Sequence, residues 1–287
     1  MTRPAARLKA ILAQKNAALM PGAPNALIAN LIADQGFDCA YITGAGVTNM
    51  FLGAPDVGLL TMTEMVNHIA AIADSVDLPL LVDGDTGFGN AVNTYRTVRS
   101  FERAGASGIQ LEDQIFPKKC GHFSGKGVIP IEEMVQKIRA ATDARQDENF
   151  QIVARTDAIA VNGIDDAMDR AHRYIEAGAD VTFVEAPESL EDIERVAREL
   201  SVPQIFNYVF GGKTPPVSHA ELQRMGFGAG LFANAALQAA ILSARNVLQE
   251  LKATGSLDGV RDLMASFELR QDSVNKTKFD ARERKYS

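Results

Sequence analysis

The sequence of 287 residues contains only two cysteines, Cys39 and Cys120, and no apolar run long enough to span a bilayer. Two cysteines do not supply a disulfide framework, so we expect a protein of the reducing cytoplasm. The net charge of −7, without clustered Lys and Arg, excludes a general nucleic-acid footprint. Residues 1–16 lack the apolar core and small-residue cleavage site of a secretory signal. We therefore expect a globular protein whose partners are neither nucleic acid nor membrane.

Two common kinds of site are also missing from the sequence. The four histidines are scattered along the chain and do not have the spacing of a zinc site. No G-x-G-x-x-G motif follows an early apolar run, which argues against a dinucleotide-binding sheet.

What recurs instead is a short apolar run, a polar or glycine-rich turn, and then an amphipathic stretch. Several stretches end at a glycine, such as Gly105 or Gly226, which is a common helix stop. Short apolar runs that alternate with helices predict a parallel sheet buried on both faces. The predicted strands are Ala17–Met20, Cys39–Thr43, Pro79–Val82, Gly108–Leu111, Gln151–Ala154, Val181–Val184, Gln204–Phe206 and Gly230–Ala233. The predicted helices are Asn25–Gln35, Thr63–Ser75, Ala91–Ala104, Ile131–Arg145, Ile164–Ala177 and Leu190–Leu200.

Eight such units favour an α/β fold of the (β/α)₈ barrel type, and an open, doubly wound sheet is the alternative. The barrel would occupy residues 1–255, including a strongly apolar helix at Ala235–Ala253. Residues 256–287 would form a C-terminal helical extension. Because a complete barrel has no further place for these helices, we expect them to cap it or to pack on a neighbouring subunit.

Polar and ionisable side chains follow almost every predicted strand. In barrel enzymes the active site lies at the carboxyl ends of the strands, so these side chains are expected to converge. Asp, Thr and Asn are also common helix caps and turn formers, but Glu112, Arg155 and Glu185 are not preferred caps. The ring as a whole therefore predicts a site. Its members are Thr43, Asp83, Asp85, Glu112, Asp113, Arg155, Asp157, Glu185 and Asn207.

Three of these residues predict a magnesium site. Asp83 and Asp85 follow one strand and Glu112 ends the next. Mg²⁺ takes oxygen ligands and keeps several waters, so one direct carboxylate and two water-mediated carboxylates are enough. A polar turn before Gly87 and Gly89 is the alternative interpretation of the two aspartates.

A reactive thiol and an anion-binding turn are predicted elsewhere on this mouth. Cys120 lies in the run Lys118-Lys119-Cys120-Gly121-His122, where basic neighbours favour the thiolate and glycine-rich flanks suit a mobile loop. An incidental surface cysteine is the alternative, whereas Cys39 is interpreted as a small core residue. The run Thr43-Gly44-Ala45-Gly46 offers a hydroxyl and N–H groups for a carboxylate, or is only a tight turn. The site would thus contain a metal ion, groups that bind a carboxylate, and a thiol. This combination is suited to stabilising an enolate and to protonating a carbanion-like carbon.

These motifs resemble those of the isocitrate lyase/phosphoenolpyruvate mutase superfamily. The Lys-Lys-Cys-Gly-His run is similar to the catalytic loop of the C–C lyase branch of that family. The match runs in order from about residue 17 to about residue 250. The segments that carry it are Thr43-Gly44, Leu52–Asp56, Asp83–Asn90, Leu111–Gln114, Lys118–His122, Ala154–Asp157 and Gly211–Pro215.

The resemblance implies an enzyme that needs Mg²⁺, with Mn²⁺ as the alternative ion, and that acts on a small carboxylate. Asp85 would be the direct metal ligand, and Asp83 and Glu112 would hold the ion through water. The resemblance also implies a barrel whose last helix is exchanged between subunits. The assembly would be a homotetramer, built as a dimer of helix-swapped dimers.

The resemblance implies further roles in substrate binding and catalysis. Cys120 would protonate the leaving enolate, on a loop that closes as a lid. Catalysis would also involve Tyr41, Lys119, His122 and Arg155. The substrate contacts would be Thr43, Gly44, Ala45, Asp56, Gly121, Arg155, Glu185, Asn207 and Phe210.

Two segments depart from the family pattern. Members that cleave the tricarboxylate methylisocitrate resemble one another in carrying a glutamate where this chain has Phe210. The eighth strand ends in Phe232-Ala233-Asn234-Ala235, where many relatives have Tyr-Pro-Leu-Ser. The wall of the site is therefore rebuilt, and a tricarboxylate is not the expected substrate.

The leading hypothesis is a lyase that cleaves the C2–C3 bond of a small 2-hydroxy-dicarboxylate and releases a 2-oxo acid. A phosphonate-forming mutase similar to carboxyvinyl-carboxyphosphonate phosphorylmutase and an oxaloacetate decarboxylase or hydrolase are the alternatives among enzymes. A catalytically silent carboxylate-binding barrel is the non-enzyme alternative. Intact Asp85, Glu112, Arg155 and Cys120 argue against it.

Overall fold

Eight parallel strands form the centre of the computed structural model, which describes residues 3–119, 125–211 and 214–287. Every predicted strand is present, and its ends lie within two residues of the predicted ones, because short apolar runs bounded by turns have few other ways to be buried. The strands are β1 (Ala18–Pro21), β2 (Ala40–Ile42), β3 (Leu80–Asp83), β4 (Gly108–Glu112), β5 (Gln151–Thr156), β6 (Val181–Val184), β7 (Ile205–Asn207) and β8 (Ala229–Phe232).

The strands close into a barrel. Strands β2 to β6 pair in chain order as one parallel sheet, and β1, β8 and β7 pair as another. Parallel bridges between Gly22 and Tyr41 and between Thr182 and Gln204 join the two sheets at both edges. The (β/α)₈ prediction is confirmed, and the open doubly wound alternative is wrong.

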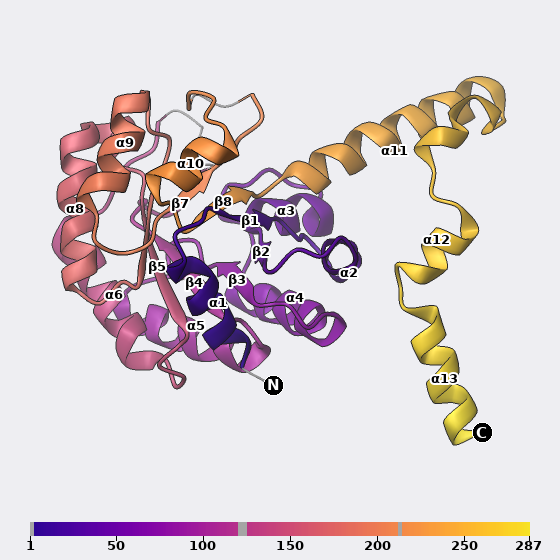
Figure 1. Cartoon of the computed structure of the whole chain (residues 1–287), viewed down its shortest axis with the longest axis horizontal. Helices are drawn as coiled ribbons and strands as arrows, with labels where there is room; N and C mark the ends of the chain where they lie inside the picture. Colours follow the sequence, from indigo (N-terminus) through magenta and orange to yellow (C-terminus); the bar gives the residue numbers. More distant parts are fainter. Residues whose placement is uncertain (1–2, 120–124, 212–213) are drawn as a thin grey trace.

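Helices cover the outside of the barrel (Figure 1). Their starts follow from the sequence: Thr61 with Glu64, Ser189 with Asp192 and Ser218 with Glu221 form reciprocal capping boxes. The helices up to β8 are α1 (Pro4–Ala13), α2 (Ala26–Asp34), α3 (Gly44–Val47), the π-helical η1 (Thr48–Leu52), α4 (Met62–Ser75), α5 (Ala91–Ala104), α6 (Ile131–Ala144), α7 (Ile159–Asn162), α8 (Ile164–Glu176), α9 (Leu190–Glu199) and α10 (His219–Met225).

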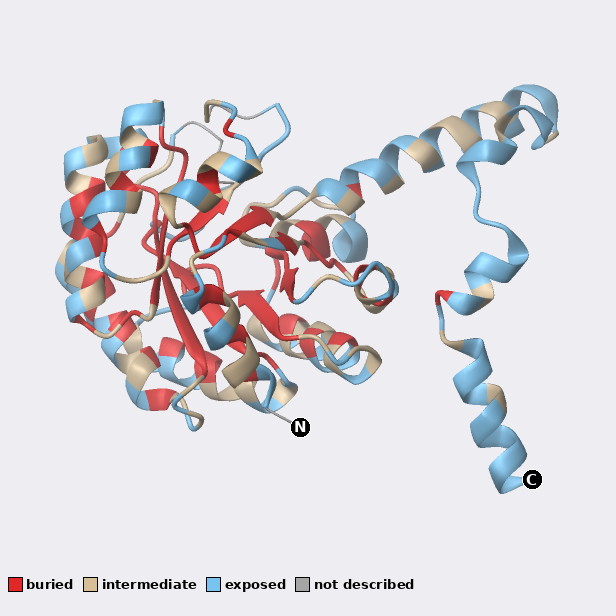
Figure 2. Ribbon diagram, in the orientation of Figure 1, coloured by how far each residue is buried: buried red, intermediate tan, exposed pale blue. Residues whose placement is uncertain are grey.

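The core has an outer layer between strands and helices and an inner cluster within the barrel. The inner cluster contains Met20, Val153 and Leu231 from the strands, together with Leu8 and Leu12 of α1. Leu8 and Leu12 are fully buried, so α1 closes the amino-terminal end of the barrel. The sequence analysis did not predict this helix. Figure 2 shows the buried strands surrounded by half-exposed helices.

The C-terminal part leaves the barrel as an arm (Figure 1). It consists of α11 (Ala235–Thr254), the 3₁₀ helix η2 (Asp258–Leu263), α12 (Phe267–Asp272) and α13 (Lys276–Tyr286). Within α11, which the structure describes in full, only Leu237 is buried, whereas Ile241 and Leu248 are 55% and 63% exposed. The arm touches the barrel again where the Asn30 side chain donates a hydrogen bond to the Ser273 carbonyl. The division of the chain at residue 255 stays a prediction.

None of the described helices combines the length and the apolar character that crossing a bilayer requires.

Candidate active site

A cavity of about 860 Å³ lies at the carboxyl ends of the strands. This volume is within the range typical of small-molecule sites. The structure brings most of the predicted residues to it: Tyr41, Thr43, Ala45, Asp56, Asp83, Glu112, Lys119, Arg155, Glu185, Asn207 and Phe210 line the cavity. Asp85 lies just behind this lining, in contact with Lys118. Cys120, Gly121 and His122 lie outside the described residues.

Arg155 of β5 is the central cation of the polar side. Its guanidinium Nε and Nη2 donate to the two carboxylate oxygens of Asp157 at 2.8 and 3.1 Å. Nη2 is also 3.2 Å from Glu185 Oε2, and Nε is 3.5 Å from Glu112 Oε2. Burial alone would lower the Arg155 pKa, but these three carboxylates raise it well above its ordinary value. Arg155 is therefore a fixed positive charge at the bottom of the cavity.

Asp83 is held in place by its own loop and by the turn after β2. Its Oδ2 accepts a hydrogen bond from the Gly44 amide and its Oδ1 one from the Asp85 amide, both at 3.2 Å. A Cβ on Gly44 would lie 2.9 Å from Asp83 Oδ2, so this close approach requires glycine. The Gly44 amide, which the family resemblance assigned to the substrate carboxylate, is thus already engaged with Asp83.

Asp85 and Glu112 are carboxyl groups in a poorly solvated place. Asp85 has a left-handed backbone with φ 46°, which is unusual for a residue other than glycine. Burial raises the pKa of Asp85 to about 6, with Lys118 lowering it and Asp83 raising it further. Burial likewise raises the Glu112 pKa well above its ordinary value, although Arg155 opposes this. Glu112 Oε1 is buried and accepts no hydrogen bond from the described residues.

Lys118, which was not among the predicted site residues, lies among these carboxylates. Its ammonium is 2.5 Å from Asp56 Oδ1 and 2.7 Å from Asp85 Oδ1, and its side chain is 4% exposed. The Lys119 ammonium instead donates to the Gly125 carbonyl at 2.9 Å. Two adjacent lysines carry no sequence signal that tells which one turns inward, so the sequence could not separate them.

The carboxylates supply the hard oxygen donors that Mg²⁺ prefers, at the ends of the neighbouring strands β3 and β4. The unpartnered Oε1 of Glu112 is consistent with an acceptor for a metal-bound water. In the part of the chain that the structure describes, no three His, Cys, Asp or Glu side chains are already arranged as a metal-binding group. The residues fit a divalent ion by donor type; here Asp85 contacts the Lys118 ammonium and Glu112 lies 3.5 Å from Arg155 Nε.

Two predicted groups make hydrogen bonds that limit their roles. The Tyr41 hydroxyl donates to Gln110 Oε1 at 3.0 Å, and burial raises the Tyr41 pKa well above 10.0. Tyr41 is therefore a neutral donor and not a base. The Asn207 amide lies 3.4 Å from Glu185 Oε1, and the Asn207 Oδ1 is buried without a partner among the described residues. That oxygen is available to accept a hydrogen bond from a ligand.

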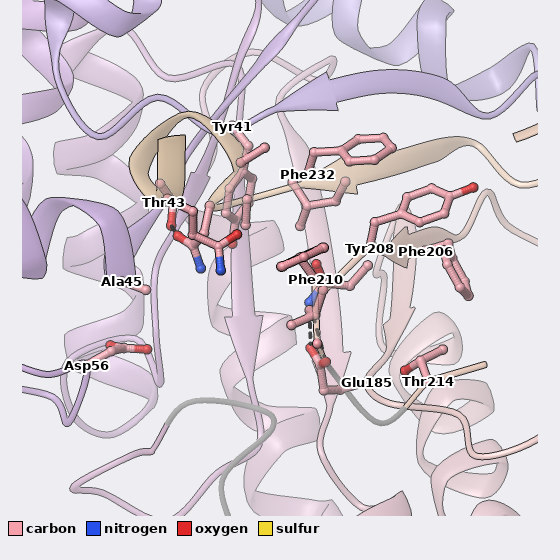
Figure 3. A pocket seen from close by; sticks show the side chains of 18 of the residues that line it. Tyr41, Thr43, Ala45, Asp56, Glu185, Phe206, Tyr208, Phe210, Thr214 and Phe232 are labelled. Atoms are coloured by element: carbon pink, nitrogen blue, oxygen red, sulfur yellow. Dashed lines mark hydrogen bonds between the residues drawn. The ribbon is translucent and has the colours of Figure 1, made fainter. Parts of the chain in front are cut away.

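An aromatic wall faces the polar side (Figure 3). Tyr208 stacks on Phe232 with ring centroids 4.4 Å apart, and Phe206 meets Tyr208 edge-on at 5.0 Å. Phe210 lies at the rim with 90% of its surface exposed. The sequence analysis singled out Phe210 and Phe232 but did not predict Phe206 or Tyr208, because apolar residues near a strand end are usually core residues. The cavity therefore combines a charged half and an apolar half.

Comparison with known proteins places this arrangement in a family. The sequence profile described as phosphoenolpyruvate phosphomutase matches residues 8–252. The chain is 43% identical to 2,3-dimethylmalate lyase of Eubacterium barkeri, over 99% of this chain and 98% of that protein. It is 40% identical to 2-methylisocitrate lyase of Aeropyrum pernix, over 91% and 84%.

A solved structure is also similar to this chain. Oxaloacetate acetylhydrolase in complex with 3,3-difluorooxalacetate superimposes with a TM-score of 0.90 and 31% identity, over 98% of both chains. The barrel, the carboxylates at its mouth and these relatives confirm the family resemblance. Among the members of the family, the chain is similar to named carbon–carbon lyases. The chain therefore belongs to the isocitrate lyase/phosphoenolpyruvate mutase family.

Proposed function

We propose that this protein is a Mg²⁺-dependent lyase that cleaves the C2–C3 bond of a small, alkyl-substituted 2-hydroxy-dicarboxylate. The observation that carries the proposal is the division of one cavity into a charged half around Arg155 and an aromatic half around Tyr208 and Phe232. Such a cavity suits a small dicarboxylate whose carboxylates lie toward the charged half and whose alkyl substituents lie against the aromatic half. The likeness to 2,3-dimethylmalate lyase supports the same substrate class.

The reaction would proceed as a retro-aldol type cleavage. A base in the site would take the proton of the 2-hydroxyl. The oxygen electron pair would then form the C2 carbonyl while the C2–C3 bond breaks and its electron pair passes to C3 and its adjoining carboxylate as an enolate. Proton transfer from the Cys120 thiol to C3 completes the second product, and C2 leaves as the carbonyl carbon of a 2-oxo acid. The role of Cys120 rests on the family motif, since this residue lies outside the described residues.

The described residues would bind and orient the substrate. Arg155 would pair with the C1 carboxylate as a permanent cation. The unpartnered Asn207 Oδ1 would accept a hydrogen bond from a protonated oxygen of the substrate. Asp85 would hold Mg²⁺ directly and Asp83 and Glu112 through water, and the ion, when bound, would stabilise negative charge on the 2-oxygen. Mn²⁺ is expected to substitute for it.

The test is turnover of 2,3-dimethylmalate with Mg²⁺, in wild type and in Cys120→Ser. General-acid transfer accounts for roughly 10²–10⁴-fold in rate, so the variant should lose that much kcat while KM changes little. Unchanged turnover in Cys120→Ser would show that Cys120 is not the general acid, whereas a wild type that leaves 2,3-dimethylmalate intact and consumes oxaloacetate would favour a decarboxylase or hydrolase. The likeness to oxaloacetate acetylhydrolase makes oxaloacetate the substrate to assay beside it. No turnover of any C4–C7 diacid would favour the silent binding barrel.

We further propose a homotetramer in which α11 is exchanged between subunits. Support comes from the apolar side chains that the arm exposes in a single chain, including Ile241, Leu248 and Phe267. Exposed apolar surface of this kind marks an interaction site. With two cysteines among 287 residues, we propose the cytoplasm as the location.

A further inference from the structure

Lys118 is a buried cation inside a group of carboxylates. Its ammonium contacts Asp56, from the segment after η1, and Asp85, from the loop after β3. Asp83 and Glu112 lie close enough to act on it electrostatically. Two carboxylates thus contact one lysine and two more act on it electrostatically, and its side chain is only 4% exposed.

A cation at this place is needed for the carboxylates to remain charged. Burial strongly disfavours an ionised carboxylate unless it is paired. The Lys118 ammonium lies 2.5 Å from Asp56 Oδ1 and 2.7 Å from Asp85 Oδ1, so it partly neutralises the group. A divalent ion bound to Asp85 would supply the same compensation with twice the charge.

The two cations compete for the same carboxylate. Asp85 has little freedom to turn away, because its left-handed backbone and the hydrogen bond from its amide to Asp83 fix its loop. The lysine side chain, by contrast, is a flexible four-carbon chain. Lys118 also borders the cavity, as does Asp56, its other partner. The ammonium can thus leave Asp85 while it remains paired with Asp56.

We propose that Lys118 is an exchangeable internal cation that neutralises the metal-free carboxylate group, leaves Asp85 when a divalent ion binds, and then presents its ammonium to the cavity. This inference rests on the metal dependence in the proposed function. Metal binding in the wild type includes the free energy of breaking the Lys118–Asp85 pair. Lys118 is then a positioning residue that couples occupation of the metal site to an added positive charge in the cavity.

The first experiment measures Mn²⁺ binding to the full chain by calorimetry, in wild type, Lys118→Met and Lys119→Met. Methionine is similar to lysine in length and flexibility but uncharged. Lys118→Met should bind Mn²⁺ at least tenfold more tightly, because the competing cation is gone. Lys119→Met removes the same charge from the neighbouring residue, whose ammonium contacts only the Gly125 carbonyl among the described groups, and should stay within twofold. Unchanged or weaker binding by Lys118→Met would overturn the exchange.

The second experiment uses the wild type and so does not depend on whether the variant folds. Reductive methylation, quantified by mass spectrometry, should modify Lys118 at least fivefold faster with saturating Mg²⁺ than without it. Lys137 is the internal control, since it is equally buried but donates to the Thr86 carbonyl and lies outside the carboxylate group. Lys118 labelling that stays constant or falls would contradict the exchange. If the wild type binds no Mn²⁺ at all, the proposed metal dependence itself is wrong, and the exchange is wrong with it.

Discussion

Arg155 and Asp157 form a bidentate ion pair at the end of β5, with N···O distances of 2.8 and 3.1 Å. Residues two apart on an extended strand point to the same side, which places both side chains toward the mouth of the barrel. The Lys126 ammonium meets the same carboxylate at 2.6 Å. Burial would raise the Asp157 pKa, but Arg155 and Lys126 outweigh it and lower the pKa to about 2. The pair fixes the guanidinium that we propose binds the substrate.

Asp157→Asn should therefore destabilise the protein by about 3 kcal/mol, the low end of the range for breaking a buried ion pair. Because the folded-state pKa lies below the ordinary 3.8, the stability that Asp157 contributes is present above pH 4 and is lost as the pH falls through about 2. Urea unfolding of the wild type and of Asp157→Asn at pH 7 measures the loss of stability, and the same measurement at pH 3 shows how much of the difference between them has been lost. Asp165→Asn is the matched control, because it breaks an equally short pair with Arg195 in which Asp165 is 87% exposed. That variant should lose less than about 0.5 kcal/mol, and equal losses in the two variants would contradict the assignment.

The sequence predicted the barrel and the polar residues at the carboxyl ends of its strands. Apolar runs that alternate with amphipathic helices leave few folds that bury both the strands and the apolar faces of the helices. It did not predict α1, whose Leu8 and Leu12 fill the barrel, since a short helix without a capping side chain gives a weak signal. It also did not name Lys118, whose ammonium contacts Asp56 and Asp85. Which side chain of a loop faces a cluster depends on long-range contacts, here with Asp56 and Asp85, that no local pattern contains.

A second prediction concerns the metal. Asp85→Ala should abolish turnover, and excess Mg²⁺ should not restore it, because the ion would lose its direct protein ligand. Treatment of the wild type with EDTA should have the same effect, reversed by added Mg²⁺ or Mn²⁺. Asp77→Ala, which changes an exposed aspartate paired with Arg7, is the control and should behave as wild type. Full activity of the wild type after EDTA treatment would rule out the metal assignment.

A third prediction concerns the arm. Sedimentation at micromolar concentration should give a tetramer for the wild type, because assembly would bury the apolar side chains of α11. Leu248→Glu introduces a charge on α11 at a side chain that is 63% exposed in the single chain, and should shift the protein to smaller species. Val92→Glu on α5, where the side chain is 77% exposed, is the matched control and should not. A wild-type monomer would refute the exchanged-helix assembly.

A fourth prediction uses the cysteine count. In Cys120→Ser the remaining thiol is Cys39, which is fully buried and whose pKa is raised to about 12, mainly by burial. The thiolate is the reactive form, so its fraction at pH 8 is roughly one in ten thousand in the folded state. Iodoacetamide should leave the folded variant unmodified and should add one adduct after unfolding in urea, as read by mass spectrometry. Rapid modification of the folded variant would show that the segment around Cys39, next to β2, unfolds locally and exposes the thiol.

The last prediction concerns which substrates are excluded, and it depends on Phe210. The family resemblance implies a glutamate at this place in methylisocitrate-cleaving members, where it would join a polar network around a third carboxylate. The phenylalanine side chain offers no hydrogen bond, and the neighbouring Tyr208 and Phe232 stack their rings against one another. An unpaired carboxylate against this wall is unfavourable, whereas a methyl group buried there gains about 0.8 kcal/mol. We therefore expect a higher kcat/KM for 2,3-dimethylmalate than for 2-methylisocitrate.

Phe210 is 90% exposed at the rim, so its own share of this preference should be moderate. Phe210→Glu should narrow the ratio of the two kcat/KM values by about tenfold, equivalent to about 1.4 kcal/mol. Val92→Glu adds the same charge at an exposed residue outside the cavity lining and should leave the ratio unchanged. A wild-type preference for 2-methylisocitrate would contradict the apolar wall as the source of selectivity. A ratio unaffected by Phe210→Glu would instead show that Phe210 points away from the bound substrate and that Tyr208 and Phe232 alone set the preference.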